Sequence, residues 1–253
     1  MRRRALLAAG ALALAGAAPA PRPPLAATPL SRMDAKWWAE RHAAKLRELK
    51  AGRVDLLWIG DSITQDWEKS GPPAWQDFAP VWQRFYGGRH VVNLGFSGDA
   101  TAHLLWRLRN GQLTQAKGAV LLIGANNFGR LRWSVEDSLK GHDACVAEIR
   151  RMVPKLVVIS VLPSDRGAWT TQATRGMNAG LAQRYAGGKV QGVTFVDATP
   201  LFERNGEIDR DQYYDKLLRP PEPSIHPTAQ AHARLAALIE PQVAAMLGDR
   251  TRS

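Results

Sequence analysis

A chain of 253 residues is long enough to bury a full hydrophobic core, and single domains of this size are common. The formal net charge of +11 would suit anionic surfaces or acidic glycans, but the basic residues are scattered and match no nucleic-acid-binding motif. Nucleic acid is therefore not an expected partner. The single cysteine, Cys145, excludes an intramolecular disulfide, and its place in a predicted helix indicates a packed apolar residue.

The first thirty residues differ in composition from the rest of the chain. Arg2–Arg4 precede an apolar, alanine-rich stretch over residues 5–18, which is too short for a membrane-spanning helix. Residues 1–20 are therefore predicted to be a secretory signal peptide, with a frayed helix as the alternative, and the mature protein is expected to be secreted or periplasmic. Residues 21–30 are predicted to be a proline-rich linker without packing of its own, and residues 31–253 a single domain.

The remaining sequence alternates between apolar runs and helical stretches. A helix that carries Trp37, Trp38, His42, Leu46 and Leu49 precedes five apolar runs at residues 54–59, 90–94, 119–123, 156–162 and 193–196. Helical stretches lie around residues 101–110, 135–152 and 171–185, and a last helix follows Thr228 and ends near Gly248. Apolar runs without polar alternation are typical of a parallel sheet covered on both faces. The sequence predicts a three-layer α/β/α sandwich with a five-stranded parallel, doubly wound (flavodoxin-like) sheet.

The residues after the first predicted strand favour a nucleophilic serine. Gly60 interrupts the apolar run, so Ser62 stands at the carboxyl end of the strand, where open α/β sheets place their sites. The backbone N–H of Ser62 lies near a predicted helix start, which suits a nucleophile whose attack creates an oxyanion. The alternative is a serine that only caps the helix.

Three later segments supply partners for this serine at the ends of other strands. Gly98, in a glycine-rich segment after the second strand, leaves its N–H unobstructed by a side chain. Asn126, after the third strand, brings a side-chain amide, a role that Asn127 could take instead. His226, just before the last helix, can accept the proton of Ser62. Together these residues predict acyl transfer, with the N–H groups of Ser62 and Gly98 and the amide of Asn126 holding the oxyanion.

Other aromatic and acidic residues lie close to the same strand ends. Trp67, Trp133 and Trp169 are candidates for lining an acyl or sugar pocket, and ordinary packing under loops is the alternative for each. Asp61 and Asp99 are expected to hold the site loops through hydrogen bonds to the backbone. No spacing of His, Asp or Glu indicates a metal site, and no cofactor is expected.

The four segments resemble the SGNH (GDSL-type) hydrolases in their order and in their places at strand ends. Gly60–Ser62 matches the nucleophile segment of that family, and Gly98, Asn126 and His226 match its oxyanion glycine, oxyanion asparagine and base. Residues 93–108 resemble the branch that contains platelet-activating-factor acetylhydrolase catalytic subunits and bacterial acyl esterases. The resemblance implies esterase activity, and the absence of Gly-x-Ser-x-Gly argues against an α/β-hydrolase nucleophile elbow.

The chain departs from this family at one position. The family carries an aspartate three residues before its histidine, and Pro223 stands at that position here. Asp215 is the first candidate for the acid that orients His226, because Tyr213–Leu217 resembles the family's aspartate segment with an insertion before the histidine. Glu222 is the second candidate. A backbone carbonyl is the third, and it would leave a Ser-His dyad.

The predicted function is a serine esterase that hydrolyses small acyl esters, with O-acetyl groups on carbohydrate among them. The same residues would support acyl transfer to a sugar hydroxyl, because hydrolysis and transfer differ only in the second nucleophile. A carbohydrate- or lipid-binding protein with weakened catalysis is the alternative that Pro223 suggests. The expected partner is a small-molecule or glycan acyl ester, with no nucleic acid and no integral membrane span.

Overall fold

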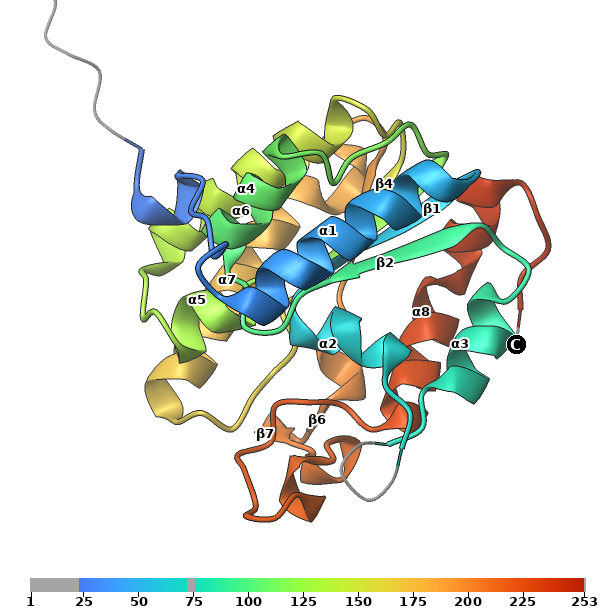
Figure 1. Ribbon diagram of the computed structural model, residues 1–253. Helices are drawn as coiled ribbons and strands as arrows, with labels where there is room; N and C mark the ends of the chain where they lie inside the picture. Colours follow the sequence, from blue (N-terminus) through green and yellow to red (C-terminus); the bar gives the residue numbers. More distant parts are fainter. Residues whose placement is uncertain (1–22, 72–75, 253) are drawn as a thin grey trace, which may run out of the picture.

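The computed structural model describes residues 23–71 and 76–252, so the predicted signal peptide lies outside the described residues. Five parallel strands form the central sheet: β1 Leu56–Gly60, β2 Val91–Gly95, β3 Gly118–Leu122, β4 Leu156–Ile159 and β5 Val193–Val196. Their order is β2-β1-β3-β4-β5 (Figure 1). This is the predicted doubly wound, flavodoxin-like arrangement.

Helices lie on both faces of this sheet (Figure 1). The α-helices are α1 Lys36–Ala51, α2 Ser62–Gln65, α3 Ala79–Tyr86, α4 Thr101–Arg109, α5 Ala125–Gly129, α6 Val135–Arg150, α7 Ala168–Tyr185 and α8 Ala229–Leu247. Short 3-10 turns are η1 Leu25–Ala27, η2 Asp66–Glu68, η3 Ala186–Gly188, η4 Thr199–Leu201, η5 Arg210–Gln212 and η6 Asp215–Leu217, and β6 Glu203–Arg204 pairs with β7 Glu207–Ile208. The predicted long helices are confirmed, whereas α3 is too short for its periodicity to be noticed in the sequence.

The core consists of two clusters, one on each face of the sheet. Along β1, Leu57 and Ile59 pack into the first cluster with residues of α4, α6 and α7. Leu56 and Trp58 point to the opposite face and pack into the second cluster with residues of α3 and α8. Because both faces are buried, the strands appear in the sequence as continuous apolar runs.

The sheet brings the ends of three strands to the same edge. Gly60 of β1 is in register with Gly95 of β2 and Leu122 of β3, so the segments that follow these strands start side by side. The turn of α2 then lies directly on the end of β2, because a methyl group at Gly95 would collide with the backbone of Thr64 and Gln65. This close approach fixes the first helical turn after β1.

The residues before α1 pack against the domain, so the expectation of a linker without packing is wrong for residues 24–30. Ala26 in η1 is buried, and its carbonyl accepts a hydrogen bond from the Thr101 hydroxyl at 2.9 Å. A methyl group at Gly141 of α6 would collide with the same carbonyl. Small residues on both sides allow the proline-rich segment to lie flat on the helix.

We expect Gly95→Ala to lower the free energy of unfolding by about 1–3 kcal/mol, the usual cost of forcing extra atoms into a packed interior. The added methyl group would meet backbone atoms of α2, which cannot rotate away as a flexible side chain can. Gly52→Ala is the control, because its methyl group would meet nothing within 4 Å and its φ of −175° suits any residue. Urea denaturation measures both, and equal small effects would contradict the close approach.

Candidate active site

Ser62 is held in the first turn of α2, directly after β1. Asp61 caps this helix, because its Oδ1 accepts a hydrogen bond from the backbone N–H of Ile63 at 3.0 Å. The Ser62 hydroxyl is therefore not used as a cap, and the residue is 6% exposed. Burial raises the pKa of the Asp61 carboxyl to about 7, although the N–H of Ile63 opposes the rise.

His226 approaches this serine from the segment before α8. Its Nε2 lies 3.0 Å from Ser62 Oγ, which is within range for proton transfer. Thr228 caps α8 by accepting a hydrogen bond from the N–H of Ala231 at 3.1 Å. The cap fixes the path of the chain two residues after the histidine.

Asp215 is the acid beside the imidazole. Its Oδ1 lies 2.7 Å from His226 Nδ1, and the side chain is fully buried. Its Oδ2 accepts two further hydrogen bonds, from the backbone N–H groups of Ile225 at 2.8 Å and His226 at 2.6 Å. With Nδ1–H donating to Asp215, the lone pair of Nε2 faces Ser62. The first of the three predicted candidates therefore lies in contact with the histidine.

The segment between the acid and the histidine loops out, as the insertion in the sequence suggests. Tyr213 and Pro227 form an isolated antiparallel bridge at its base, and the N–H of Tyr214 donates to the carbonyl of His226 at 3.0 Å. Glu222, the second candidate, uses its backbone N–H to donate to the Asp215 carbonyl at 3.2 Å, and its side chain is exposed. The bridge holds residue 215 beside residue 226 although eleven positions separate them.

The surroundings of His226 favour its protonated form. Burial lowers the pKa of the imidazole, but the hydrogen bond to Asp215 and the negative charges of Asp66 and Asp215 outweigh burial, so the pKa lies above its ordinary value. A raised pKa makes the neutral imidazole a better proton acceptor.

Sequence reasoning missed the second acid behind this histidine. The ring of Tyr214 stacks on the His226 ring with centroids 5.9 Å apart, and its hydroxyl donates to Asp66 Oδ2 at 3.2 Å. The other oxygen of Asp66 lies 2.7 Å from Lys69 Nζ. An acidic residue four positions after Ser62 was the only signal in the sequence, and only the fold brings it close to position 214.

The three predicted oxyanion donors lie on neighbouring segments. The N–H of Ser62 belongs to the first turn of α2, where helices leave N–H groups free. Gly98 has a φ of +76°, a left-handed conformation that favours glycine. The Asn126 amide donates one hydrogen to the Asp99 carbonyl at 3.0 Å, which leaves its second hydrogen for another acceptor. Within the described segments, no group accepts a hydrogen bond from the N–H of Ser62 or Gly98.

Asn127 is engaged elsewhere and does not compete for this role. Its Oδ1 accepts from the N–H of Thr101 at 3.1 Å, and its Nδ2 donates to the Thr101 hydroxyl at 2.9 Å. These two bonds tie α5 to the start of α4. Both ends of the Asn127 amide are thus fixed on Thr101 and the residue is fully buried, so Asn126 is the better placed of the two asparagines to donate to a substrate.

The two aspartates expected to hold the loops behave differently. Asp61 bonds to the backbone, as predicted. Asp99 instead accepts hydrogen bonds from side chains: Arg107 Nε at 2.8 Å, Arg32 Nη1 at 2.8 Å and Trp38 Nε1 at 2.9 Å. The expectation of backbone bonds is wrong for Asp99, because three nearby side-chain donors saturate its carboxylate.

The proposed pocket tryptophans separate into two groups. The prediction that Trp67 lines a pocket is wrong, because this residue is only 2% exposed. Its ring packs in the core against four other rings, those of Trp58, Trp82, Tyr86 and His232. Trp169 is 39% exposed and lies against Phe128 of α5. Trp133 is half-buried. A substrate role for Trp133 and Trp169 stays a prediction.

Cys145 is packed, as predicted. Burial raises the pKa of its thiol to about 12, and its S–H lies 3.3 Å from the carbonyl of Thr101. Across residues 23–71 and 76–252, no three or more His, Cys, Asp and Glu side chains are grouped to hold a metal ion. In the same part of the chain, no helix has the length and apolar character needed to span a membrane.

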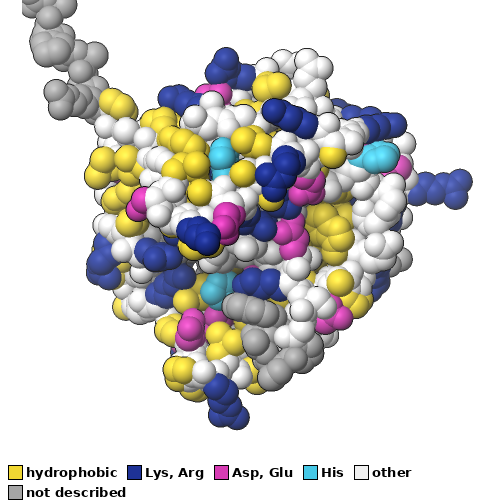
Figure 2. Space-filling model, viewed as in Figure 1, with side chains coloured by type: hydrophobic (Ala, Val, Ile, Leu, Met, Phe, Trp, Pro, Cys, Tyr) yellow, Lys and Arg dark blue, Asp and Glu magenta, His cyan; other side chains and the backbone are white. Residues whose placement is uncertain are grey.

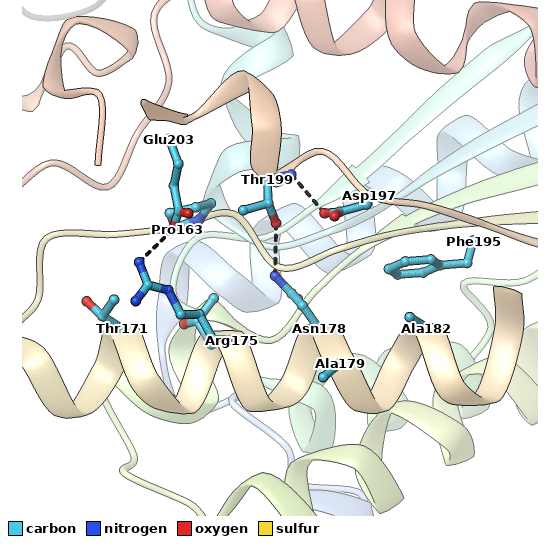
Figure 3. Close-up of a pocket in the computed structure, with 11 residues that line it drawn as sticks. Pro163, Thr171, Arg175, Asn178, Ala179, Ala182, Phe195, Asp197, Thr199 and Glu203 are labelled. Carbon is cyan, nitrogen blue, oxygen red and sulfur yellow. Dashed lines mark hydrogen bonds and ion pairs between the residues drawn. The ribbon is translucent and has the colours of Figure 1, made fainter. Parts of the chain in front are cut away.

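A separate cavity of about 270 Å³ lies between α7 and the segment after β5 (Figure 3). Its polar groups bond to one another: Arg175 Nη2 lies 3.3 Å from Glu203 Oε1, and Asn178 Nδ2 lies 3.4 Å from Thr199 Oγ1 (Figure 3). The cavity contains no serine and no histidine. Ser62 and His226, the residues predicted to carry acyl transfer, therefore lie outside this cavity.

Known proteins place the chain in a family. Residues 58–234 match the GDSL-like Lipase/Acylhydrolase family, which is more than half of the chain. The chain belongs to this family. The human platelet-activating factor acetylhydrolase IB subunit alpha1 is 29% identical over 191 residues, which cover 71% of this chain and 74% of that protein. Against the alpha2 subunits, the match spans about half of their length (52%).

Solved structures agree on the fold. A GDSL-like lipase from Bacteroides thetaiotaomicron superposes with a TM-score of 0.63 at 17% identity, over 81% of this chain and 97% of that chain. An acetylxylan esterase from Geobacillus stearothermophilus gives a TM-score of 0.51 at 20% identity, over 79% and 97%. The predicted resemblance to SGNH hydrolases and the predicted fold class are confirmed.

We expect Asp215→Asn to lower kcat for ester hydrolysis by about 10³–10⁴-fold, the order found when the orienting acid of a serine triad is neutralised. Loss of the carboxylate charge also lowers the pKa of His226, so the acid limb of the pH–rate profile moves to lower pH. Kinetics over a range of pH values measure both effects.

Glu222→Gln is the matched control, because the exposed Glu222 side chain makes no hydrogen bond to His226. It is expected to keep its turnover and its pH profile. An equal loss in both variants, or an acid limb that does not move in Asp215→Asn, would contradict the assignment.

Proposed function

We propose that this protein is a serine esterase that hydrolyses small acyl esters, O-acetyl esters among them. The observation that supports this most is the unbroken chain of hydrogen bonds from Ser62 through His226 to Asp215, with distances of 3.0 and 2.7 Å. Three donors from neighbouring segments complete the arrangement that acyl transfer needs.

In the proposed first step, Ser62 Oγ attacks the ester carbonyl carbon while its proton passes to His226 Nε2. The carbonyl oxygen becomes an oxyanion, which accepts hydrogen bonds from the N–H groups of Ser62 and Gly98 and from the Asn126 amide. When the intermediate collapses, the C–O bond to the alcohol breaks, and His226 returns the proton to the departing oxygen. The acyl group is then esterified to Ser62.

In the second step, water attacks the carbonyl carbon of the acyl-enzyme while one of its protons passes to His226 Nε2. The bond to Ser62 Oγ breaks, Ser62 regains its proton, and the carboxylic acid leaves. Asp215 stabilises the imidazolium in both steps and keeps Nε2 directed at the serine, which supports full turnover. The alternative of a binding protein depended on Pro223, which stands where the family has its aspartate. The contact between Asp215 and His226 favours the esterase over that alternative.

An acetyl ester is the first substrate to test because an acetyl esterase has the same fold. The acetylxylan esterase from Geobacillus stearothermophilus shares the fold of this chain, and removal of an acetyl group is the activity that its name describes. Transfer to a sugar hydroxyl would use the same residues with a different second nucleophile.

We expect Ser62→Ala to reduce hydrolysis of a chromogenic acetyl ester by at least about 10³-fold, because removal of a triad nucleophile eliminates the covalent route. A fluorophosphonate should label Ser62 in the unaltered protein, and mass spectrometry identifies the labelled peptide. Ser31→Ala is the control, since Ser31 is exposed and its hydroxyl accepts a hydrogen bond from the nearby N–H of Met33, far in sequence from the proposed site. Labelling of another residue, or full activity in Ser62→Ala, would refute the nucleophile.

We also propose that the protein is exported and loses about its first 20 residues. The support is the sequence alone: Arg2–Arg4 precede an apolar stretch that is followed by small residues. N-terminal sequencing of the protein after expression in a bacterium with an intact secretion system should find a chain that begins near residue 21. Recovery of an intact Met1 form from the cytosol would refute the proposal.

A further inference from the structure

Two arginines flank the segment that carries the oxyanion candidate Asn126. Arg130 directly follows α5, and its guanidinium lies against Gly98, since a methyl group there would collide with Arg130 Nη1. Arg166 comes from the segment before α7, and its Nη1 donates to the carbonyl of Ala125 at 3.2 Å. Both cations are therefore next to the segments that hold the predicted oxyanion donors.

Neither arginine is in direct contact with an acid in the described part of the chain. In residues 23–71 and 76–252, no Asp or Glu forms an ion pair with Arg130 or Arg166, whereas the nearby Arg32 and Arg107 both bind Asp99. The remaining residues of the chain contain no Asp or Glu. Figure 2 shows Lys and Arg side chains gathered on the side of the molecule where Figure 1 places α5. Basic side chains therefore cluster on this side of the domain (Figure 2).

The charged form of Arg166 is disfavoured by its surroundings, and a bound anion would stabilise it. Burial lowers the pKa of its guanidinium and the positive charge of Arg130 adds to this, while Asp61, Asp215 and Glu222 oppose it without forming a hydrogen bond. Two of these acids already have hydrogen-bonded partners of their own. A partly buried cation beside a like charge has a cost in free energy, which a bound anion would offset.

We propose that Arg130 and Arg166 form an anion subsite next to the oxyanion donors, so that the preferred substrate is an acyl ester that itself carries a carboxylate or a phosphate. The inference rests on the proposed esterase function and narrows its substrate class. The planar guanidinium fork matches both anions, because each presents two oxygens to parallel N–H groups. An acetylated uronic acid is the simplest substrate with these properties.

Three acetyl esters of one methyl galactoside test the subsite, with the acetyl group on the same hydroxyl in each. The first keeps the neutral primary alcohol, the second has a carboxylate at that carbon, and the third has a phosphate ester there. We expect kcat/KM for at least one anionic ester to exceed that of the neutral ester by about tenfold at low salt, the effect of one charge-assisted hydrogen bond. The preference should decrease as salt is added.

Arg130→Gln and Arg166→Gln should each reduce the anionic-to-neutral ratio of kcat/KM by about threefold or more, as expected for loss of a partly screened charge. Arg47→Gln removes the same charge from an exposed position on α1 and should keep the ratio. Arg130 is exposed, so its variant keeps the test valid even if Arg166→Gln fails to fold.

Calorimetry gives a readout that does not require turnover. The Ser62→Ala protein should bind the carboxylate ester more tightly than the neutral ester, and the difference should disappear when Arg130→Gln is added. A ratio near one in the unaltered protein, or a ratio that the arginine variants leave unchanged, would overturn the subsite. If none of the three esters shows hydrolysis that depends on Ser62, the proposed esterase function fails, which is a separate result.

Discussion

The buried carboxylate of Asp99 holds together the segments on which the site depends. Arg107, also fully buried, donates to Asp99 at 2.8 Å and to the carbonyls of Gly60 at 3.1 Å and Leu94 at 3.2 Å. Its guanidinium lies over the ring of Phe96, 4.0 Å from the centroid. One planar cation thus joins the ends of β1 and β2 to the loop after β2, so none of these can shift alone.

The same aspartate extends this framework to the third donor. Its backbone carbonyl accepts from the Asn126 amide, and its carboxylate also binds Arg32 and Trp38 from the N-terminal part of the domain. Removing one partner of a buried ion pair typically costs about 3–5 kcal/mol, so the arrangement resists rearrangement. Oxyanion stabilisation depends on donors that are already directed before the reaction starts, and this framework would supply that rigidity to the proposed donors.

Sequence patterns predicted the secondary structure, which depends on neighbouring residues. They did not predict contacts between segments that are distant in the sequence. Continuous apolar runs such as residues 54–59 identified the sheet because both of its faces are buried. The prediction of Trp67 as a pocket residue was wrong because its ring lies in the core, packed against Trp58. No local sequence pattern indicates this direction of the side chain. The Tyr214 contact with Asp66 joins positions 148 residues apart, so only the folded chain reveals it.

The bridge between Tyr213 and Pro227 fixes the positions of Asp215 and His226 relative to each other. Their contact therefore does not depend on the length of the chain between them. Residues 216–224 leave and return at fixed points, and doubling the length of such a loop costs only about 0.6 kcal/mol in closure entropy. A change in the length of this segment is therefore expected to leave the Asp215–His226 contact in place. A proline at position 223 is therefore compatible with an acid beside the imidazole, because Asp215 reaches His226 from the other end of this segment.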